Sequence, residues 1–523
     1  MKIEQIKYRL YFIIRNKLRQ VRSFTYRYSV LSKAKPLTLL PSLDSFLSLK
    51  NDKFTFLNLE QQFEDRIDWN YLGHGKLWAY NLNYFEYLHQ REMTSDKGLT
   101  LIYDFIGSIQ SNKEGLEPFP ISLRGINWIK FLSYHKINDQ KINDSLYAQY
   151  KILMDNLEYH ILGNHLLENG FSLLFGAYYF QDEIFYEKAK QILLRELKEE
   201  ILNDGGHFEL SPMYHQLMLF RILDCINLVK YNEYKNHALL AVLEDKAKVM
   251  LGWINTLTFQ NGAIPLFNDS TNNVAPTTKQ LNDYARKLDD DFNYSSVKLS
   301  DSGYRKFFQS KYELVVDVGN IGPDYIPGHA HSDTFNFEMY IDHKPFIVDT
   351  GLSTYEANMR REFERSTQSH NTVVVDGLNQ SEVWGGFRVA NRAKIIDFNE
   401  STNQVEATHD GYKRIDILHT RTFKSNIDEV SIIDKIDSKT DHECVAYLHF
   451  HPDIKVSESE GLLITNIAVI NFQGNTGIRL DKYKYAPEFN KTYTGQCAVI
   501  SFNKKLSTKI VIENTIRGKH ENN

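Results

Sequence analysis

Residues 328–351, GHAHSDTFNFEMYIDHKPFIVDTG, decide the fold of the C-terminal half of this chain. Side chains 334–341 alternate between the two faces of a strand, residues 342–345 interrupt the pattern, and an apolar run follows at 346–349. Two strand-like runs joined by a short polar turn predict a β-hairpin. The hairpin would fold Asp349 back toward His331.

Three histidines and one aspartate gather in and just after this stretch. His329 and His331 precede the hairpin, Asp349 ends it, and His370 precedes another strand-like run at 372–375. Imidazole nitrogens and carboxylate oxygens are ligands of zinc sites, and a further histidine can act as a catalytic base. Any one of these histidines could instead be an ordinary surface or core residue. The combination of His-x-His, Asp and His predicts a metal site beside a catalytic group.

The N-terminal half reads as successive amphipathic helices from about residue 70 to 262. Apolar residues at helical spacing fall on one face between 219 and 229. Helices that follow one another with short breaks predict a helical toroid or solenoid. The expected helices include 152–162, 165–179, 184–201 and 214–231.

The composition changes between residues 269 and 305, where Ser, Thr, Asn, Asp and Lys replace the apolar periodicity. Beyond it, β-type runs separated by turn residues predict an antiparallel β-sandwich. We therefore expect an N-terminal basic helical extension at 1–55, a helical toroid at 56–300 and a β-sandwich at 301–523. The strand-like runs lie at 312–318, 373–375, 430–433, 444–450 and 498–502.

The overall charge and the cysteines exclude several classes of protein. A formal net charge of −5 and a pI near 6.4 argue against a protein that binds nucleic acid. The cysteines are odd in number and far apart, so they indicate neither a disulfide framework nor a zinc knuckle. They are Cys225, Cys444 and Cys497.

Residues 1–27 interleave Lys and Arg with apolar residues, without the apolar core and cleavage site of a signal peptide. The chain has no run of 18 apolar residues, so we expect no helix that spans a membrane. The segment predicts a basic amphipathic helix packed on the body, with contact to anionic lipid as the alternative. We expect a cytoplasmic protein. If residues 1–27 contact anionic lipid, the protein would be peripheral to the membrane.

Polar residues mark the starts of several expected helices. Asn164 stands at the N-cap position of a helix that would begin at His165. Tyr214 follows Pro212 at another helix start, where the helix dipole and nearby cations would lower the pKa of a phenol. Arg124 precedes an apolar helix and could either clamp a carboxylate or form a salt bridge within the fold.

Several short motifs follow one another along the chain. They are FLNL at 56–59, LWAYNLNY at 77–84, SLRGINWIK at 122–130, Asn164-His165, SPMYH at 211–215, GHAHSD at 328–333 and SHNT at 369–372. In this order they resemble the heparinase II/III family of polysaccharide lyases, over about residues 55 to 450. The resemblance implies an incomplete (α/α) toroid followed by an antiparallel β-sandwich. It also implies cleavage of a uronic-acid-containing polysaccharide by β-elimination.

The resemblance assigns roles to individual residues. Asn164 and His165 would neutralise the uronate carboxylate, because the C5 proton is only weakly acidic until that charge is stabilised. Tyr214 and His329 would then remove the C5 proton and protonate the leaving O4, the uronate epimer deciding which does which. The expected substrate contacts are Arg124, Asn268 and Trp128.

The resemblance also implies one divalent metal ion, and we expect zinc rather than calcium. His331, Asp349 and His370 match the metal ligands of the family. The expected role is structural, since an ion there would pin the loop that carries His329.

Two other functions stay open at this point. Family relatives without a secretion signal resemble proteins encoded with bacterial polysaccharide assembly systems. The glycan could therefore be an endogenous capsule or exopolysaccharide, and the chain a non-catalytic glycan-binding protein of such a system. A hydrolase with Glu209 and Asp269 as acid and base is the third hypothesis, although the sequence does not fix the carboxyl separation that it needs. In each case the expected partner is an acidic polysaccharide or oligosaccharide, and the complete catalytic set favours the lyase.

Overall fold

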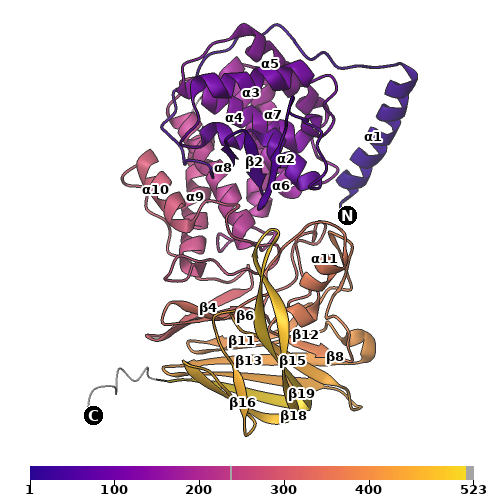
Figure 1. Ribbon diagram of the computed structural model, residues 1–523, viewed down its shortest axis with the longest axis vertical. Helices are drawn as coiled ribbons and strands as arrows, with labels where there is room; N and C mark the ends of the chain where they lie inside the picture. Colours follow the sequence, from indigo (N-terminus) through magenta and orange to yellow (C-terminus); the bar gives the residue numbers. More distant parts are fainter. Residues whose placement is uncertain (236–237, 514–523) are drawn as a thin grey trace.

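The computed structural model describes residues 1–235 and 238–513, a helical region followed by a β region (Figure 1). This order confirms the predicted fold class. The last described helix before the β region ends at Leu288, and the first strand of the sandwich begins at Tyr304. The final residues of the segment predicted at 301–523 lie outside the described residues.

The helical region has its most deeply buried helix at its centre. Every side chain of α6 is buried except that of His165, and α6 packs against α4, α7 and α8. In the described part of the chain, no helix is both long enough and apolar enough to cross a membrane. The helices are α1 (Ile3–Val21), α2 (Lys76–Tyr84), α3 (Ser95–Ser108), α4 (Pro118–Tyr134), α5 (Gln140–Asp155), α6 (Gly163–Phe180), α7 (Glu183–Glu200), α8 (Pro212–Lys230), α9 (Ala238–Leu257) and α10 (Thr278–Leu288). A small sheet of β1 (Leu49–Lys50), β2 (Lys53–Phe56) and β3 (Leu59–Gln62) precedes α2.

Two helix boundaries differ from the sequence prediction. The helix expected at 152–162 is only the end of α5, which stops at Asp155. The helix expected from His165 begins at Gly163, and Leu162, at φ 66°, is its N-cap residue. Asn164 therefore lies inside the first turn, and the predicted capping role of Asn164 is wrong.

A four-stranded antiparallel sheet forms one layer of the sandwich. It contains β4 (Tyr304–Phe308), β5 (Tyr312–Asp317), β6 (Phe337–Ile341) and β7 (Lys344–Ile347) in that order. β6 and β7 form the predicted hairpin, with Ile341 paired to Lys344. Asp342 and His343 connect them at φ 47° and 62°, as a tight two-residue hairpin turn requires.

A ten-stranded sheet forms the other layer, and all of its pairings are antiparallel. The two layers share a core in which Phe337 of β6 meets Phe423 of the large sheet, with ring centroids 5.7 Å apart. The strands are β8 (Val373–Val375), β11 (Ile395–Ser401), β12 (Gln404–His409), β13 (Leu418–Asn426), β14 (Glu429–Asp437), β15 (Cys444–His449), β16 (Ser457–Ser459), β17 (Leu462–Ile464), β18 (Ala468–Glu488) and β19 (Lys491–Ile512). Helix α11 (Met359–Glu364) lies at the end of the sandwich that faces the helical region (Figure 1), and β9 (Glu382–Trp384) and β10 (Arg388–Ala390) form a separate two-stranded hairpin.

The two regions are joined by direct contacts. The long hairpin of β18 and β19 reaches the helical region, where Asn490 Nδ2 donates to the Leu57 carbonyl at 2.9 Å (Figure 1). At a second contact between the two regions, the ring of Phe259 stacks on that of Tyr340 with centroids 3.8 Å apart. These contacts join the β region to the helical region at two places.

Candidate active site

A cleft of about 850 Å³ lies at the junction of the two regions. Its helical wall comes from α1, α2 and the first turns of α4, α6 and α8. Its β wall comes from the loop between β5 and β6, from residues 355–356 and from the β9–β10 hairpin. All four residues predicted to be catalytic line this cleft, namely Asn164, His165, Tyr214 and His329.

The rings of Tyr214 and His329 lie against each other in the cleft. Their ring centroids are 4.2 Å apart, and the Tyr214 hydroxyl lies 3.1 Å from the Tyr355 hydroxyl. Ser211 caps α8 by accepting a hydrogen bond from the Tyr214 amide, which fixes the start of the helix. Burial raises the pKa of Tyr214, so the expectation of a lowered phenol pKa is wrong. Tyr214 is a neutral phenol that can donate a proton.

His329 is oriented by a buried carboxylate, that of Asp269. The Nδ1 atom of His329 lies 2.8 Å from Asp269 Oδ2, and Nε2 of His331 lies 2.8 Å from Oδ1. Arg361 also contacts both oxygens, at 2.5 and 2.7 Å. Burial alone would raise the pKa of Asp269, but Arg361 and the two histidines hold it well below its usual range.

The charge on Asp269 decides the tautomer of His329. A carboxylate only accepts hydrogen bonds, so Nδ1 of His329 carries the hydrogen and donates it. In the neutral imidazole, Nε2 is then an unprotonated base. This atom lies 3.9 Å from Oε2 of Glu209, a carboxylate that would stabilise the imidazolium once Nε2 has taken a proton.

Asn164 and His165 occupy the first turn of α6. Asn164 Nδ2 donates to Glu209 Oε2 at 3.3 Å, while Oδ1 of Asn164 is buried without a partner. His165 Nδ1 lies 2.9 Å from Oε1 of Glu158. Burial by itself would lower the pKa of His165, but the Glu158 carboxylate raises it above the ordinary value. The turn therefore offers the cleft a histidine whose protonated form is favoured by Glu158, and an amide oxygen without a hydrogen-bond partner.

Arg124 does not line the cleft. It is fully buried in α4, and its guanidinium donates to Gln149 Oε1 and to the carbonyls of Asn83 and Gly115, at 2.8, 3.0 and 2.7 Å. These bonds fasten α4 to its neighbours, which contradicts the predicted substrate contact. The alternative of a salt bridge is also absent, because the acceptors are neutral.

Trp128 and Asn268 are also turned away from the cleft. Trp128 is buried in the aromatic core, edge-on to Phe85 with centroids 5.3 Å apart. Asn268 is buried next to Asp269, and its Oδ1 accepts a hydrogen bond from the His331 amide at 3.0 Å. The predicted substrate contacts of both residues are therefore wrong, and Asn268 instead positions the His331 backbone.

The predicted metal ligands lie directly behind His329. His370 Nδ1 is 2.7 Å from Asp349 Oδ2, and the His331 and His370 rings are 5.3 Å apart between centroids. His331 Nδ1, His370 Nε2 and Asp333 Oδ2 are buried without hydrogen-bond partners, which is the donor chemistry that a zinc ion needs. The described residues nevertheless contain no group of three or more such side chains arranged to hold an ion. The metal site therefore stays a prediction.

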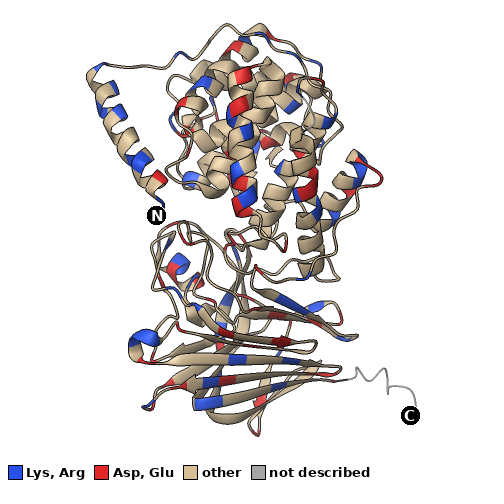
Figure 2. Cartoon of the chain, turned by 180° about the vertical axis from the view of Figure 1, so that it is seen from behind, with Lys and Arg blue, Asp and Glu red and all other residues tan. Residues whose placement is uncertain are grey.

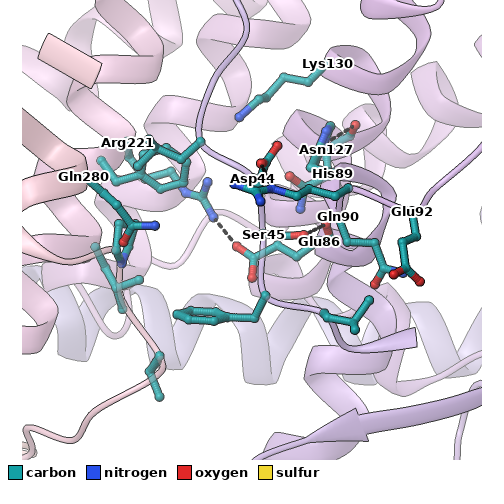
Figure 3. A pocket seen from close by; sticks show the side chains of 18 residues that line it. Asp44, Ser45, Glu86, His89, Gln90, Glu92, Asn127, Lys130, Arg221 and Gln280 are labelled. Carbon is teal, nitrogen blue, oxygen red and sulfur yellow. Dashed lines mark hydrogen bonds and ion pairs between the residues drawn. The ribbon is translucent and has the colours of Figure 1, made fainter. Parts of the chain in front are cut away.

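Two smaller cavities adjoin the cleft on the helical side. One, of about 320 Å³, shares Asn164 and Tyr214 with the cleft, and the other, of about 340 Å³, shares Glu86 and Arg221 with the first. Figure 3 shows the Arg221 side chain pointing at Glu86, and their charged atoms are 3.2 Å apart. The three spaces follow one another from Asn164 and Tyr214 into the helical region.

Comparison with known proteins places these features in context. The chain matches the model described as heparinase II/III N-terminus over residues 125–294 and the model described as heparinase II/III-like, C-terminal, over 293–513. It is 26% identical over 246 residues to a heparin-sulfate lyase of Bacteroides stercoris and 28% identical over 248 residues to one of Pedobacter heparinus. Each match covers 42% of this chain, and only 37% and 36% of the respective relative. The chain thus spans little more than a third of the length of these curated relatives.

Solved structures share the fold. A heparinase III structure superposes with a TM-score of 0.67 at 15% identity, covering 95% of this chain and 89% of that one. The heparan sulfate lyase of Pedobacter heparinus gives a TM-score of 0.56 at 16% identity, covering 89% and 82%. At these identities the likeness supports the order of a helical region followed by an antiparallel β region.

Proposed function

The chain belongs to the heparinase II/III family, and from this premise we propose that it is a polysaccharide lyase acting by β-elimination on a uronic-acid-containing glycan. The observation that carries the proposal is the meeting of Tyr214 and His329, which come from separate regions and lie 4.2 Å apart between ring centroids. Asn164 and His165 line the same cleft. A purely structural pair of rings would not require the neighbouring histidine paired with Glu158, nor the unpaired acceptor of Asn164.

The first step is stabilisation of the uronate carboxylate. The cationic form of His165, which Glu158 favours, would neutralise one carboxylate charge. If the carboxyl takes a proton from the cationic form of His165, Oδ1 of Asn164 would accept a hydrogen bond from it. Such groups act most strongly in a cleft where water is displaced, because charge is then poorly screened.

The second step moves two protons. The C5–H bond breaks as its electrons form the C4=C5 double bond, and the C4–O4 bond breaks with its electrons going to O4. His329 Nε2 is the available base, because burial raises the pKa of the Tyr214 phenol and so keeps the phenol protonated. Tyr214 then protonates O4. The epimer of the uronate decides whether C5–H points toward His329 or requires the roles to be exchanged.

The hydrolase hypothesis is disfavoured by the state of Asp269. Both oxygens of this carboxylate are occupied by Arg361 and the two histidines, and its pKa is held well below the usual range. A glycosidase acid must hold a proton near neutral pH and reach the glycosidic oxygen. Asp269 is suited to neither task.

The cleft lining suits an acidic glycan. Arg9, Lys76, Arg388 and Arg392 contribute basic side chains, against two acidic ones from Asp324 and Glu356. The relatives named above are heparin-sulfate lyases, which makes heparan-type chains one candidate. Bacterial capsular and exopolysaccharides that contain uronate are the other candidate, in line with the sequence argument.

We propose in addition that a divalent metal, zinc by its donor set, is held by His331, Asp349 and His370. When bound, it would fix the backbone two residues from His329 and supply no chemistry to the substrate. Asp349 already accepts hydrogen bonds from Asn336, His370 and Gly351, so ion binding requires some of these to rearrange.

The test is ultraviolet absorbance of the unsaturated uronate, recorded over a panel of heparan-type, chondroitin-type, alginate and bacterial capsular polysaccharides. We expect at least one glycan to give rising absorbance with the wild-type protein and none with His329→Ala. Binding without absorbance across the panel would identify the non-catalytic glycan-binding alternative and overturn the lyase.

A further inference from the structure

Helix α1 rests on the helical region through its polar and aromatic side chains. Gln5 Nε2 donates to the Ile161 carbonyl at 2.8 Å, and the ring of Tyr8 stacks on that of Tyr159 with centroids 4.6 Å apart. The helix therefore has a fixed orientation on the protein, with one side inward. The inward side chains include Gln5, Tyr8, Phe12, Arg15 and Arg19.

The outward side of α1 is apolar, the reverse of an ordinary surface helix. Ile3, Leu10 and Ile14 are 86%, 55% and 59% exposed, at spacings that place them on one face. A soluble surface seldom leaves such a continuous row of large aliphatic side chains in water. The apolar stripe consists of Ile3, Ile6, Leu10, Ile13, Ile14, Leu18 and Val21.

Positive charge accompanies the stripe. Lys7 and Lys17 lie exposed within it, and the acidic residue of the helix, Glu4, pairs with Arg195 at 3.0 Å. Figure 2 shows Lys and Arg along α1 and a single acidic segment near its start. The outward face thus combines aliphatic side chains with unopposed lysines.

We propose that the apolar stripe of α1 docks on an anionic lipid surface, with the helix lying in the plane of the interface. Aliphatic side chains would enter the boundary between headgroups and acyl chains, and the lysines would meet lipid phosphates. A second copy of the chain fits less well. Two stripes face to face would oppose lysines of like charge, and Lys17 replaces an apolar residue at the heptad position that Ile3 and Leu10 occupy.

Docking in this orientation places the cleft beside the lipid surface. Gln5 and Arg9 of the same helix line the cleft, and α1 leaves the rest of the molecule on its other side (Figure 1). A glycan attached to or emerging from the membrane would meet the cleft without diffusing through bulk water. The docking itself does not depend on the proposed lyase activity.

Co-sedimentation with vesicles tests the proposal. The full chain is mixed with vesicles of phosphatidylcholine alone and with vesicles that also contain phosphatidylglycerol. We expect binding to the mixed vesicles that weakens as salt is added. The double variant Leu10→Asp/Ile14→Asp should bind at least about tenfold more weakly, because each buried aliphatic side chain contributes roughly that factor.

Matched controls separate this effect from general changes. Ile427→Asp alters another exposed isoleucine, 68% exposed, in the sandwich and should bind vesicles as the wild type does. Lys7→Glu/Lys17→Glu should lose the preference for phosphatidylglycerol. Circular dichroism and activity on soluble glycan should be unchanged in all variants, since none of these residues lines the cleft.

Three results would overturn the proposal. They are absence of wild-type binding to the mixed vesicles, equal binding of the Leu10→Asp/Ile14→Asp variant, and a concentration-dependent dimer in solution that this variant abolishes. The last result would identify a second copy of the chain as the occupant of the stripe.

Discussion

The two walls of the cleft position their reactive groups by different means. On the helical wall, Asn164, His165 and Tyr214 lie in the first turns of α6 and α8, so the helix backbone sets where they point. On the β wall, His329 lies in the loop between β5 and β6, and Asp269 and Arg361 hold it from outside that loop.

This difference separates side chains proposed to act on the substrate from side chains that hold others in place. A side chain in a helical first turn can lose its functional group while the helix stays in place. A loop residue held by a buried ion network cannot lose its anchor without exposing unpaired charges to a dry interior. We therefore expect substitutions on the helical wall to change rates, and substitutions behind the β wall to change stability and rates together.

Asp269→Asn should give the largest effect. The substitution leaves the buried guanidinium of Arg361 without its carboxylate, and removal of one partner from such a pair costs about 3 to 5 kcal/mol. An asparagine keeps only one acceptor oxygen, so one of His329 and His331 loses its acceptor at the same time. The free energy of unfolding, measured with denaturant, and the lyase rate should both fall.

The control for this variant is Asp324→Asn, which removes an exposed carboxylate paired with Arg392 at 3.1 Å. Its unfolding free energy should stay within about 1 kcal/mol of the wild type. If Asp269→Asn is equally mild, the network does not hold the β wall.

Among substitutions on the helical wall, Tyr214→Phe should lower the rate most clearly without lowering stability. Only a hydroxyl is lost, so stability should change by no more than about 1 kcal/mol, while loss of proton transfer should lower kcat by about 10²- to 10⁴-fold. Tyr355→Phe is the matched control, because it removes the other half of the same 3.1 Å hydroxyl pair. Similar rates in the two variants would mean that the hydrogen bond, rather than proton transfer by Tyr214, is what matters.

Removal of the proposed metal should lower activity less than Tyr214→Phe does. We expect close to one equivalent of zinc in purified protein, and we expect His370→Ala to lose the ion, some thermal stability and about 10- to 100-fold in activity. His329→Ala should keep the ion and the fold but lose turnover. Elemental analysis that finds no metal in active protein, or equal metal loss in both variants, would leave these residues as a polar network.

The sequence predicted the features that depend on local patterns. The hairpin of β6 and β7 follows from alternation interrupted by a turn, and the helical half follows from its apolar periodicity. The four predicted catalytic residues also meet in one cleft, because their motifs end at helix starts or in the loop before a hairpin. Their chemical roles stay a prediction.

Features set by distant contacts were not predictable in this way. Arg124 and Trp128 belong to a motif that resembles the family, but a motif residue can be shared because it packs rather than because it binds. Asn268 is buried and bonds the His331 amide, 63 positions away in the sequence. Arg361, Glu158 and Tyr355 carry no local signal, since their partners Asp269, His165 and Tyr214 come from other elements. Because Leu162 has a positive φ and is the N-cap residue, α6 begins at Gly163 and Asn164 does not cap it.

Glu158→Gln should give the smallest effect and would show whether the charge on His165 matters. Glu158 holds the pKa of His165 above its ordinary value against the lowering effect of burial. The variant should therefore lower this pKa while the amide can still accept from Asn169 Nδ2, which lies 3.0 Å from Oε2 in the wild type.

The sign of the expected pH dependence follows from which form of His165 is needed. A raised histidine pKa stabilises the fold below the unfolded pKa, and the contribution fades as pH rises through the folded pKa. The difference in unfolding free energy between wild type and Glu158→Gln should thus shrink toward alkaline pH. If the imidazolium neutralises the uronate, the alkaline limb of kcat/KM should also move to lower pH in the variant. An unmoved limb would show that the neutral imidazole is sufficient, and Asn164 would then carry the stabilisation of the carboxylate on the helical wall.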